Sequence, residues 1–387
     1  MTILKAGADA GNSGLKLAVL GQEPLFISSI YAHHIGEATN ILSEEDISVE
    51  ELENNIDVTI SSPALSVNNM RYVIGQKVID ENIKGIEMEK KSDKSKDDLV
   101  VLVTLAGLAV SAMKKQPNKN KIDVTFDLSV ALPVATITPK TAEEFAQRYM
   151  NHHTVKFHHP SGREVIINIQ VEYCKCLPEG AAGAWGIVYD EKGKTIKRKV
   201  EVGEDKIVET DFVDKTLLSF DIGAGTTEEV VSQGVSFKHK MSRGLPYGVK
   251  ETLLDIIKVW NLNNKQKTID SIAEFNAIYL DSEHPRHTRL KEASRGALLG
   301  LANRIATDII NKIDDMKDDP YVFIYGGGAA IVKESLQQIL EQKGRLTNVV
   351  FLKDPLFVNS RGLLVYTCSP RFDALKEKAL IAATGEK

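Results

Sequence analysis

One pattern occurs twice in the chain: an apolar run that ends in an aspartate, a turn of small residues, and a second apolar run. The first copy, residues 7–19, reads GADAGNSGLKLAV, and the second, residues 219–231, reads SFDIGAGTTEEVV. Aligning the two aspartates, Asp9 and Asp221, also aligns a glycine two positions later in each copy. Each copy predicts a β-hairpin with a glycine-rich turn, so we expect two similarly built α/β halves.

The residue types in these turns indicate an anion site. Glycine and other small residues let backbone N–H groups converge on one phosphate, with no side chain in the way. A carboxylate beside a phosphate would repel it, so Asp9 and Asp221 imply a cation in between, and Mg²⁺ prefers oxygen ligands of this kind. For a single copy, a hairpin with an Asx-type bend is the simpler interpretation. Two copies, each opening a predicted half, favour a shared Mg²⁺–nucleotide site in the crevice between the halves.

A third glycine-rich stretch, IYGGGAA at residues 324–330, lies between a predicted strand and a predicted helix. A helix N-terminus approached closely by a ligand is suited to hold a phosphate or an adenosine. The alternative is a tight strand–helix connection, which requires only one glycine. The chain contains neither the GxxxxGK[ST] of a P-loop nor the GxGxxG of a dinucleotide site, so both of those classes are excluded.

The amino-acid composition excludes several other classes of protein. An apolar content of 43% and a charged content of 26% are typical of a soluble globular protein. The formal net charge of −5 argues against direct binding of nucleic acid. The three cysteines are too few for a disulfide framework and fit the cytoplasm. The longest apolar run, residues 99–113, is too short to span a bilayer, so we expect a buried helix and no membrane partner.

The spacing of apolar residues predicts the remaining helices and strands. We expect a third strand at 24–32 and an inserted subdomain at about 33–95 whose outer edge faces solvent. The charged run MEKKSDKSKDD, residues 88–98, is predicted to be an exposed loop. Helices are expected at 97–115, 141–150, 178–189, 248–262, 294–314 and 369–383, and further strands at 123–135, 154–159, 164–174 and 348–355.

Taken in order, the three glycine-rich stretches resemble the two phosphate loops and the adenosine loop of the actin-like ATPase superfamily. The segments CLPEGAAGAWG and SRGALLGLANRIATDII resemble its two connecting helices. Within the superfamily, the chain is most similar to the ParM-like plasmid-segregation actins. It has no room for a chaperone's substrate-binding domain, and its first loop reads D-x-G-N-x-x-x-K. Its tail carries the pattern of Pro355, Asn359 and Gly362.

The resemblance implies an α/β fold of the actin type, in which a ribonuclease-H-like domain is duplicated around an interdomain nucleotide cleft. Domain I would comprise residues 1–178 and 355–387, with the insertion at about 33–95. Domain II would comprise residues 179–354. The insertion would carry the filament contacts that differ among relatives.

The resemblance also implies a role for individual residues. Asp9 and Asp221 would hold Mg²⁺, and Glu179 would orient the attacking water, so these three form the expected catalytic set. The residues expected to contact the nucleotide are Gly11, Asn12, Ser13, Gly14 and Lys16 in the first loop, Gly223, Ala224, Gly225, Thr226 and Thr227 in the second, Gly326, Gly327, Gly328 and Ala329 in the third, and Lys250 and Glu251 at a helix start.

The function implied is that of an ATPase, with ATP (GTP is the alternative) and Mg²⁺ as cofactors. It would polymerise with itself into filaments that hydrolysis destabilises, and it would move plasmid DNA through a ParR-like DNA-binding adaptor. The alternatives are a filament for cell shape or for positioning of organelles or phage, a small-molecule kinase of the same fold, and a DnaK-like chaperone module. A sugar-recognition loop with an aspartate base, which a sugar kinase needs, is not evident in the sequence.

Overall fold

The computed structural model describes residues 3–34, 45–88, 93–201 and 206–384. Its contacts divide the chain into two compact units. Unit 1 comprises residues 1–194 and 359–387, and unit 2 comprises residues 195–358. The domain boundaries expected from the sequence, at 178/179 and 354/355, stay a prediction. The helix that follows Glu179, which we expected to open domain II, falls within unit 1.

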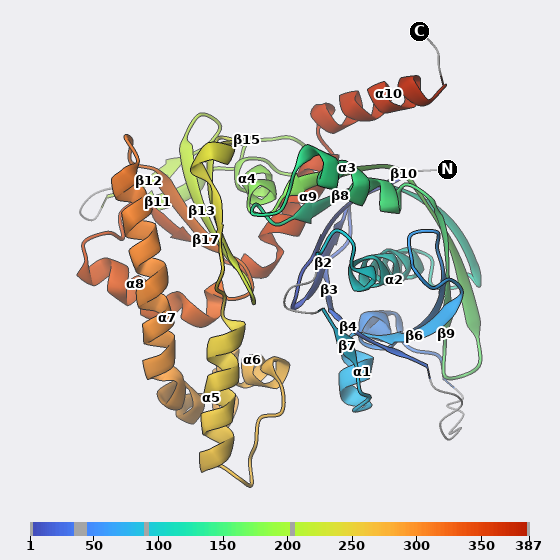
Figure 1. The fold of residues 1–387 in the computed structure, drawn as a ribbon, viewed down its shortest axis with the longest axis horizontal. Coiled ribbons are helices and arrows are strands. Elements are labelled where there is room, and N and C mark those ends of the chain that lie inside the picture. The colour runs from blue at the N-terminus through green and yellow to red at the C-terminus, as the bar shows by residue number, and fades with distance from the viewer. Residues whose placement is uncertain (1–2, 35–44, 89–92, 202–205, 385–387) are drawn as a thin grey trace. The chain divides into compact units, whose positions relative to one another are not determined.

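Unit 1 is built on a ten-stranded sheet that curls around one helix (Figure 1). The strands lie in the order β3-β2-β1-β8-β10-β9-β5-β6-β4-β7. Their bounds are β1 (Ile3–Ala10), β2 (Gly14–Val19), β3 (Leu25–Ser28), β4 (Ile30–His33), β5 (Ile56–Ser61), β6 (Met70–Ile74), β7 (Ile86–Glu87), β8 (Lys121–Leu132), β9 (His152–His158) and β10 (Glu164–Pro178). Strands from the expected insertion therefore continue the main sheet, because β5 pairs with β9.

The helix inside the curl is α2 (Asp98–Lys115), which confirms the buried helix expected there. The Asp97 side chain caps it by accepting from the Leu99 N–H at 2.9 Å. Among the described residues, no helix, α2 included, is long and apolar enough to cross a membrane. The other helices of this part are η1 (Val49–Asn54), α1 (Gln76–Asp80), α3 (Pro139–Tyr149), α4 (Ala181–Val188), α9 (Val358–Thr367) and α10 (Pro370–Thr384).

The single strand expected at 24–32 is wrong, because the chain turns at Ser29. Strand β3 pairs with β2, whereas β4 pairs with β6 and β7 at the far end of the sheet. The Ser29 side chain is buried and donates a hydrogen bond to the Gly11 carbonyl at 2.6 Å. This break therefore ties the edge of the sheet to the first glycine turn.

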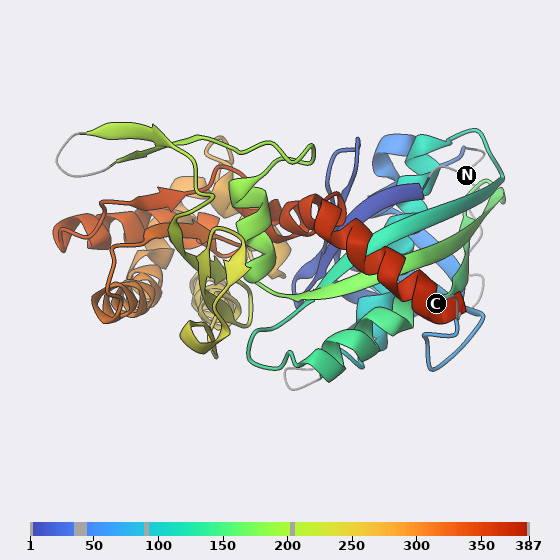
Figure 2. The same ribbon diagram turned by 90° about the horizontal axis from the view of Figure 1, so that it is seen from above.

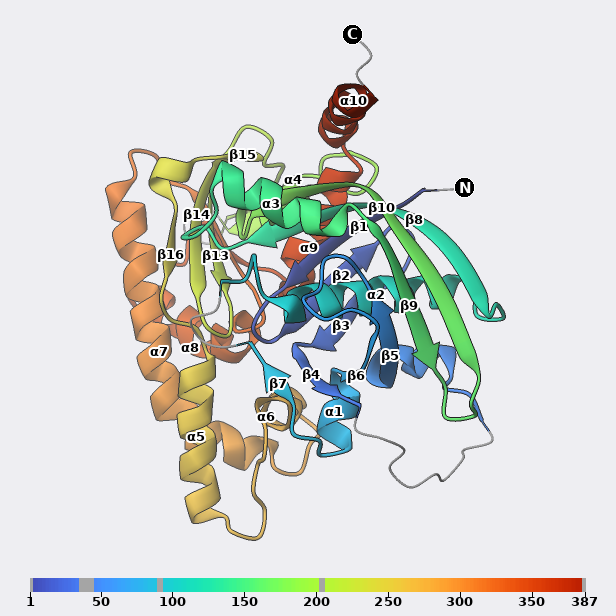
Figure 3. The ribbon, with the colours of Figure 1, turned by 45° about the vertical axis from the view of Figure 1, so that its right-hand side comes forward.

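Unit 2 holds a smaller sheet in the order β15-β14-β13-β17-β18, with β16 paired to β14. The strands are β13 (Thr216–Ile222), β14 (Thr227–Gln233), β15 (Ser236–Phe237), β16 (Arg243–Leu245), β17 (Tyr321–Tyr325) and β18 (Val349–Phe351), and a separate hairpin is formed by β11 (Arg198–Glu201) and β12 (Ile207–Thr210). The helices are η2 (His239–Met241), α5 (Lys250–Asn263), α6 (Ile272–Leu280), α7 (His287–Asp315), α8 (Ala329–Gln342) and η3 (Pro355–Phe357). Helix α7 packs against α5, α6 and α8 (Figure 3).

The two sheets share one topology over five strands, which confirms the duplication expected from the sequence. In unit 1, an antiparallel run β3-β2-β1 is followed by β8 and β10, both parallel to β1. In unit 2, the antiparallel run β15-β14-β13 is followed by β17 and β18, both parallel to β13. The carboxyl ends of parallel strands meet at one edge of a sheet, so each aspartate turn lies at the edge where α/β proteins bind ligands.

The C-terminal helices pack onto the first strands of unit 1. A Cβ on Gly7 of β1 would lie 2.3 Å from the backbone nitrogen of Leu364, so α9 approaches β1 at backbone distance. Helix α10, red in Figure 2, contacts the sheet through its first half, where Phe372 is buried and Lys376 donates to Asp127 of β8 at 2.8 Å. Lys376 also pairs with Glu172 of β10. The C-terminal helices α9 and α10 thus pack against strands β1, β8 and β10 of unit 1.

Substituting two mid-helix glycines tests this close packing. A Cβ on Gly362 of α9 would lie 2.0 Å from the Ala182 carbonyl oxygen of α4, whereas nothing lies within 4 Å of a Cβ on the exposed Gly296 of α7. We expect Gly362→Ala to lower the free energy of unfolding by about 1–3 kcal/mol through overpacking. Gly296→Ala should raise it by about 0.5–1 kcal/mol, because alanine favours the helix. Urea unfolding measures both, and equal effects would contradict the packing described.

Candidate functional site

The first aspartate hairpin is closed by one backbone bond. The Gly11 N–H donates to the Gly14 carbonyl at 3.1 Å, and Asp9 on β1 stands opposite Lys16 on β2. Asn12 and Ser13 at the tip are exposed, as expected for residues that meet a ligand. The Lys16 ammonium donates to the Ser13 hydroxyl at 3.2 Å, so a cation lies at the base of the exposed tip.

Glu179 follows β10, which is parallel to β8. Its N–H donates to the Leu132 carbonyl at the end of β8 at 2.8 Å, and Gly180 then takes a positive φ of 72° to start α4. The strand pairing and this turn hold the Glu179 carboxylate at the carboxyl edge of the sheet, where Asp9 also lies. Burial raises the pKa of Glu179, the Asp9 carboxylate adds to that effect, and a neighbouring lysine opposes it.

That lysine is Lys94, which sequence reasoning placed in an exposed charged loop. Its side chain is only 9% exposed, its ammonium group is bonded to the Glu179 carboxylate, and it lies 3.9 Å from the Asp9 carboxylate. Burial alone would lower the pKa of Lys94, but Glu179 and Asp9 outweigh burial and raise it. The expectation of an exposed loop is therefore wrong for Lys94, and residues 89–92 of that run lie outside the described residues.

The second hairpin repeats the geometry of the first. The Gly223 N–H donates to the Thr226 carbonyl at 2.9 Å, which is the counterpart of the bond from Gly11 to Gly14. The turn is also bonded to the start of α5, because the Lys250 N–H donates to the Ala224 carbonyl at 2.9 Å. Lys250 and Glu251 thus begin a helix that is bonded directly to the second loop, as the sequence placed them.

The two threonines of the second loop differ in what their hydroxyl groups can do. Thr226 is exposed at the tip of the turn. Thr227 is fully buried, and its hydroxyl donates to the Tyr247 carbonyl at 2.9 Å. Its one hydroxyl proton is therefore engaged within unit 2, and only Thr226 presents a hydroxyl donor at the surface of this loop.

The glycine triplet after β17 has a packing role of its own. Gly326 has a φ of 94°, and a Cβ there would lie 2.3 Å from Oδ1 of Asp221. A Cβ on Gly328 would lie 2.5 Å from the Val249 side chain. Gly327 is exposed, and Ala329 begins α8. Two of the three glycines are thus required by the protein's own packing, and Gly326 brings backbone directly against the expected Mg²⁺ ligand.

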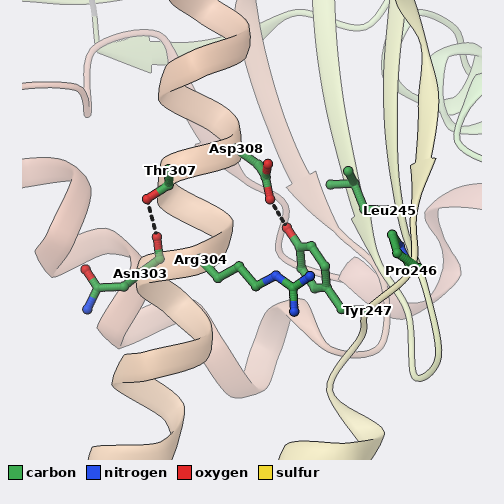
Figure 4. Close-up of a pocket in the computed structure, with 7 residues that line it drawn as sticks. All are labelled: Leu245, Pro246, Tyr247, Asn303, Arg304, Thr307 and Asp308. Atoms are coloured by element: carbon green, nitrogen blue, oxygen red, sulfur yellow. Dashed lines mark hydrogen bonds between the residues drawn. The ribbon is translucent and has the colours of Figure 1, made fainter.

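A surface cavity of about 450 Å³ lies beside the second loop within unit 2 (Figure 4). The Arg304 guanidinium lies 3.9 Å from the centre of the Tyr247 ring, and the Tyr247 hydroxyl donates to Asp308 at 2.5 Å. None of its described lining residues belongs to the predicted nucleotide set. The residues that line it are Leu245, Pro246, Tyr247, Asn303, Arg304, Thr307 and Asp308.

The predicted residues thus form two groups, each described within its own unit. In unit 1, the fold brings Asp9, Lys16 and Glu179 together at one sheet edge. In unit 2, it brings Asp221, the 223–227 loop, the glycine triplet and the start of α5 together. Sequence reasoning missed Lys94, because nothing in a run of alternating lysines and acids distinguishes it from Lys96.

A protein-family model covers the part of the chain that contains the first hairpin and Glu179. Residues 7–181, which include Asp9, Lys94 and Glu179, match the family model of the N-terminal domain of actin-like proteins. No curated protein sequence matches the chain significantly. The crystal structure of the actin-like protein Alp7A superposes with a TM-score of 0.71 at 17% identity, over 98% of this chain and 99% of that one.

The chain has the actin-like fold. ParM of Bacillus thuringiensis with ATP superposes with a TM-score of 0.69 at 18% identity, over 97% of this chain and all of that one. The psk41 ParM protein gives a TM-score of 0.65 at 13% identity, over 98% and 99% of the two chains. The resemblance to actin-like proteins of the ParM-like group, expected from the sequence, is confirmed.

The two threonines of the second loop give a paired test. Thr226→Val removes an exposed donor, and we expect affinity for ATP to fall roughly 10–100-fold with no loss of stability, as for a hydrogen bond to a charged group. Thr227→Val leaves the buried Tyr247 carbonyl without its donor and should lower the free energy of unfolding by about 1–3 kcal/mol. Fluorescent-nucleotide titration and urea unfolding measure the two effects. A reversed pattern would show that the roles are exchanged.

Proposed function

We propose that the protein is an ATPase that binds ATP with Mg²⁺, polymerises with itself and loses polymer stability on hydrolysis. The observation that carries the proposal is the repeated hairpin: an aspartate at a strand end, followed by a turn closed by the same backbone bond in both units. Solved structures of the similar ParM from Bacillus thuringiensis hold ATP, ADP or AMPPNP. The fold and the loops support the same nucleotide class here.

The residues present fit a Mg²⁺–nucleotide. Asp9 and Asp221 supply the carboxylate oxygens that Mg²⁺ prefers, and Mg²⁺ would neutralise charge on the terminal phosphates. The exposed tips, with Asn12 and Ser13 in one loop and Gly225 and Thr226 in the other, offer donors to phosphate oxygens. Lys16 places a cation beside the first tip.

Glu179 is the residue that would act on water. Phosphoryl transfer requires mainly positioning and charge stabilisation, so one carboxylate near the terminal phosphate is sufficient to orient the nucleophile. Its bond to Lys94 keeps the carboxylate in a defined orientation at the edge of the sheet.

In the cell, we propose that the polymer segregates plasmid DNA through a ParR-like adaptor. The support is the similarity to ParM and Alp7A structures and the net charge of −5, which disfavours direct contact between the filament and DNA. ATP is the nucleotide we propose, with GTP as the competing ligand in a binding assay.

Light scattering on addition of Mg²⁺ and ATP tests assembly and its link to hydrolysis. The unchanged protein should assemble and then decay as ATP is consumed. Glu179→Ala should assemble but persist, with hydrolysis slowed by about 10²–10⁴-fold. The control is Glu143→Ala, which removes an exposed carboxylate of α3 and should behave as the unchanged protein does. A protein that binds ATP but never scatters light would refute the filament, although not the fold.

Removal of the metal tests the two aspartates. ATP at about 100 times its Kd should stabilise the protein by about 2.7 kcal/mol in the presence of Mg²⁺. We expect most of the resulting shift in Tm to disappear with excess EDTA. Asp9→Asn and Asp221→Asn should each abolish the Mg²⁺-dependent part, whereas Asp319→Asn, at an exposed position of unit 2, should keep it. An equal shift with and without Mg²⁺ would contradict the metal assignment.

A further inference from the structure

We propose that Lys94 is a positioning residue for Glu179: it holds the carboxylate that orients water and separates it electrostatically from Asp9. This inference rests on the proposed ATPase function. It starts from a contact that the expected site residues do not include, because the ammonium of Lys94 is bonded to Glu179 and lies 3.9 Å from Asp9. All three side chains are at most 14% exposed.

Lys94 is held by a turn that is itself fixed in place. The Asp93 carboxylate accepts from the Ser95 N–H at 3.0 Å and from the Ser95 hydroxyl at 2.7 Å. The Asp93 carbonyl accepts from the N–H groups of Lys96 at 2.8 Å and Asp97 at 3.1 Å. These bonds make a compact turn directly before α2, and they leave the Lys94 backbone little freedom to move its side chain away from Glu179.

A second element locks the turn from outside. The Arg148 guanidinium of α3 donates to the carbonyls of Ser95 at 2.9 Å, Asp97 at 3.2 Å and Ala64 at 3.0 Å, and to the Asp98 carboxylate at 2.6 Å. Three of these four bonds are made to main-chain oxygens. The turn is therefore anchored to the body of unit 1. Lys94 and Ser95 in it are buried, whereas Asp93 and Lys96 are exposed.

Electrostatics explains why a cation is needed at this point. Asp9 and Glu179 lie at the same edge of the sheet, and two buried carboxylates without a counter-charge repel one another. A bonded ammonium compensates Glu179 and restrains its orientation. At 3.9 Å, the distance to Asp9 is too long for a hydrogen bond, so Lys94 acts on Asp9 through charge alone.

A purely structural ion pair gives different results from a positioning residue, and a double-mutant cycle separates the two. The variants are Lys94→Met, Glu179→Gln and the double variant, with Lys96→Met as the matched control. Lys96 lies in the same turn, but its side chain is 81% exposed and its nearest carboxylate, Asp93, is 3.6 Å away. Three quantities are measured: Tm without nucleotide, the Kd for a fluorescent ATP analogue with Mg²⁺, and kcat for ATP hydrolysis.

Without nucleotide, Lys94→Met should lower Tm by about 5–10 °C, because it leaves a buried carboxylate uncompensated. Adding Glu179→Gln should restore part of that loss, and the double variant also provides a folded protein if Lys94→Met alone does not fold. Lys96→Met should change Tm by no more than about 1 °C, as for an exposed pair. A Tm of Lys94→Met equal to that of the unchanged protein would overturn the buried pair.

With Mg²⁺ and nucleotide, Lys94→Met should lower kcat by about 10–100-fold, the loss that a misplaced catalytic group causes, and the Kd should change by less than about threefold. In the Glu179→Gln background, Lys94→Met should cause no further loss of kcat, because Lys94 acts through Glu179. Additive losses, or an unchanged kcat in Lys94→Met, would overturn the positioning role and leave the ATPase intact. If the unchanged protein binds no nucleotide, the proposed function itself fails.

Discussion

A carboxylate at the end of a buried strand is costly unless a cation faces it, and this requirement organises the first half of the chain. Strands β1, β8 and β10 run parallel, so Asp9 at the end of β1 and Glu179 after β10 arrive at one edge. Lys16 comes from the partner strand of the hairpin, and Lys94 comes from the turn before α2. The sheet topology thus creates both the negative pair and the need for the lysines that accompany it.

Unit 2 repeats the strand order of unit 1, but different residue types lie next to its aspartate. Asp221 ends β13 as Asp9 ends β1, and the neighbouring parallel strand, β17, leads into glycines. A Cβ on Gly326 would lie 2.3 Å from Asp221, so in unit 2 the main chain of a glycine lies next to the aspartate. In unit 1, the side chain of Glu179 lies at the same sheet edge as Asp9. The same strand plan therefore places a second carboxylate near the aspartate in unit 1 and a close backbone approach near the aspartate in unit 2.

The hairpins, the parallel strands and the buried helix α2 could be predicted because their signals are local: apolar periodicity, glycine turns and a capping aspartate. The break at Ser29 could not, because β3 and β4 read as one apolar run and are separated only by their pairing with distant strands. The same limit applies to the site. The glycine turns stand out by their spacing, and the resemblance implies the roles of the residues in them. The engaged hydroxyl of Thr227 and the buried ammonium of Lys94, in contrast, depend on Tyr247 and Arg148, which are far away in the sequence.

The burial of Lys94 shows why a charged run is a poor guide to exposure. Lys94 and Lys96 lie in one turn and have the same side chain, yet their side chains are 9% and 81% exposed. The difference arises from the direction of the turn, which Arg148 fixes by bonding the carbonyls of Ser95 and Asp97. A cation can be buried at that position because two carboxylates already face it, and each of them arrives there by strand pairing. The clustering of charges at this site is therefore a consequence of sheet topology. The composition of the loop alone cannot reveal that Lys94 is buried.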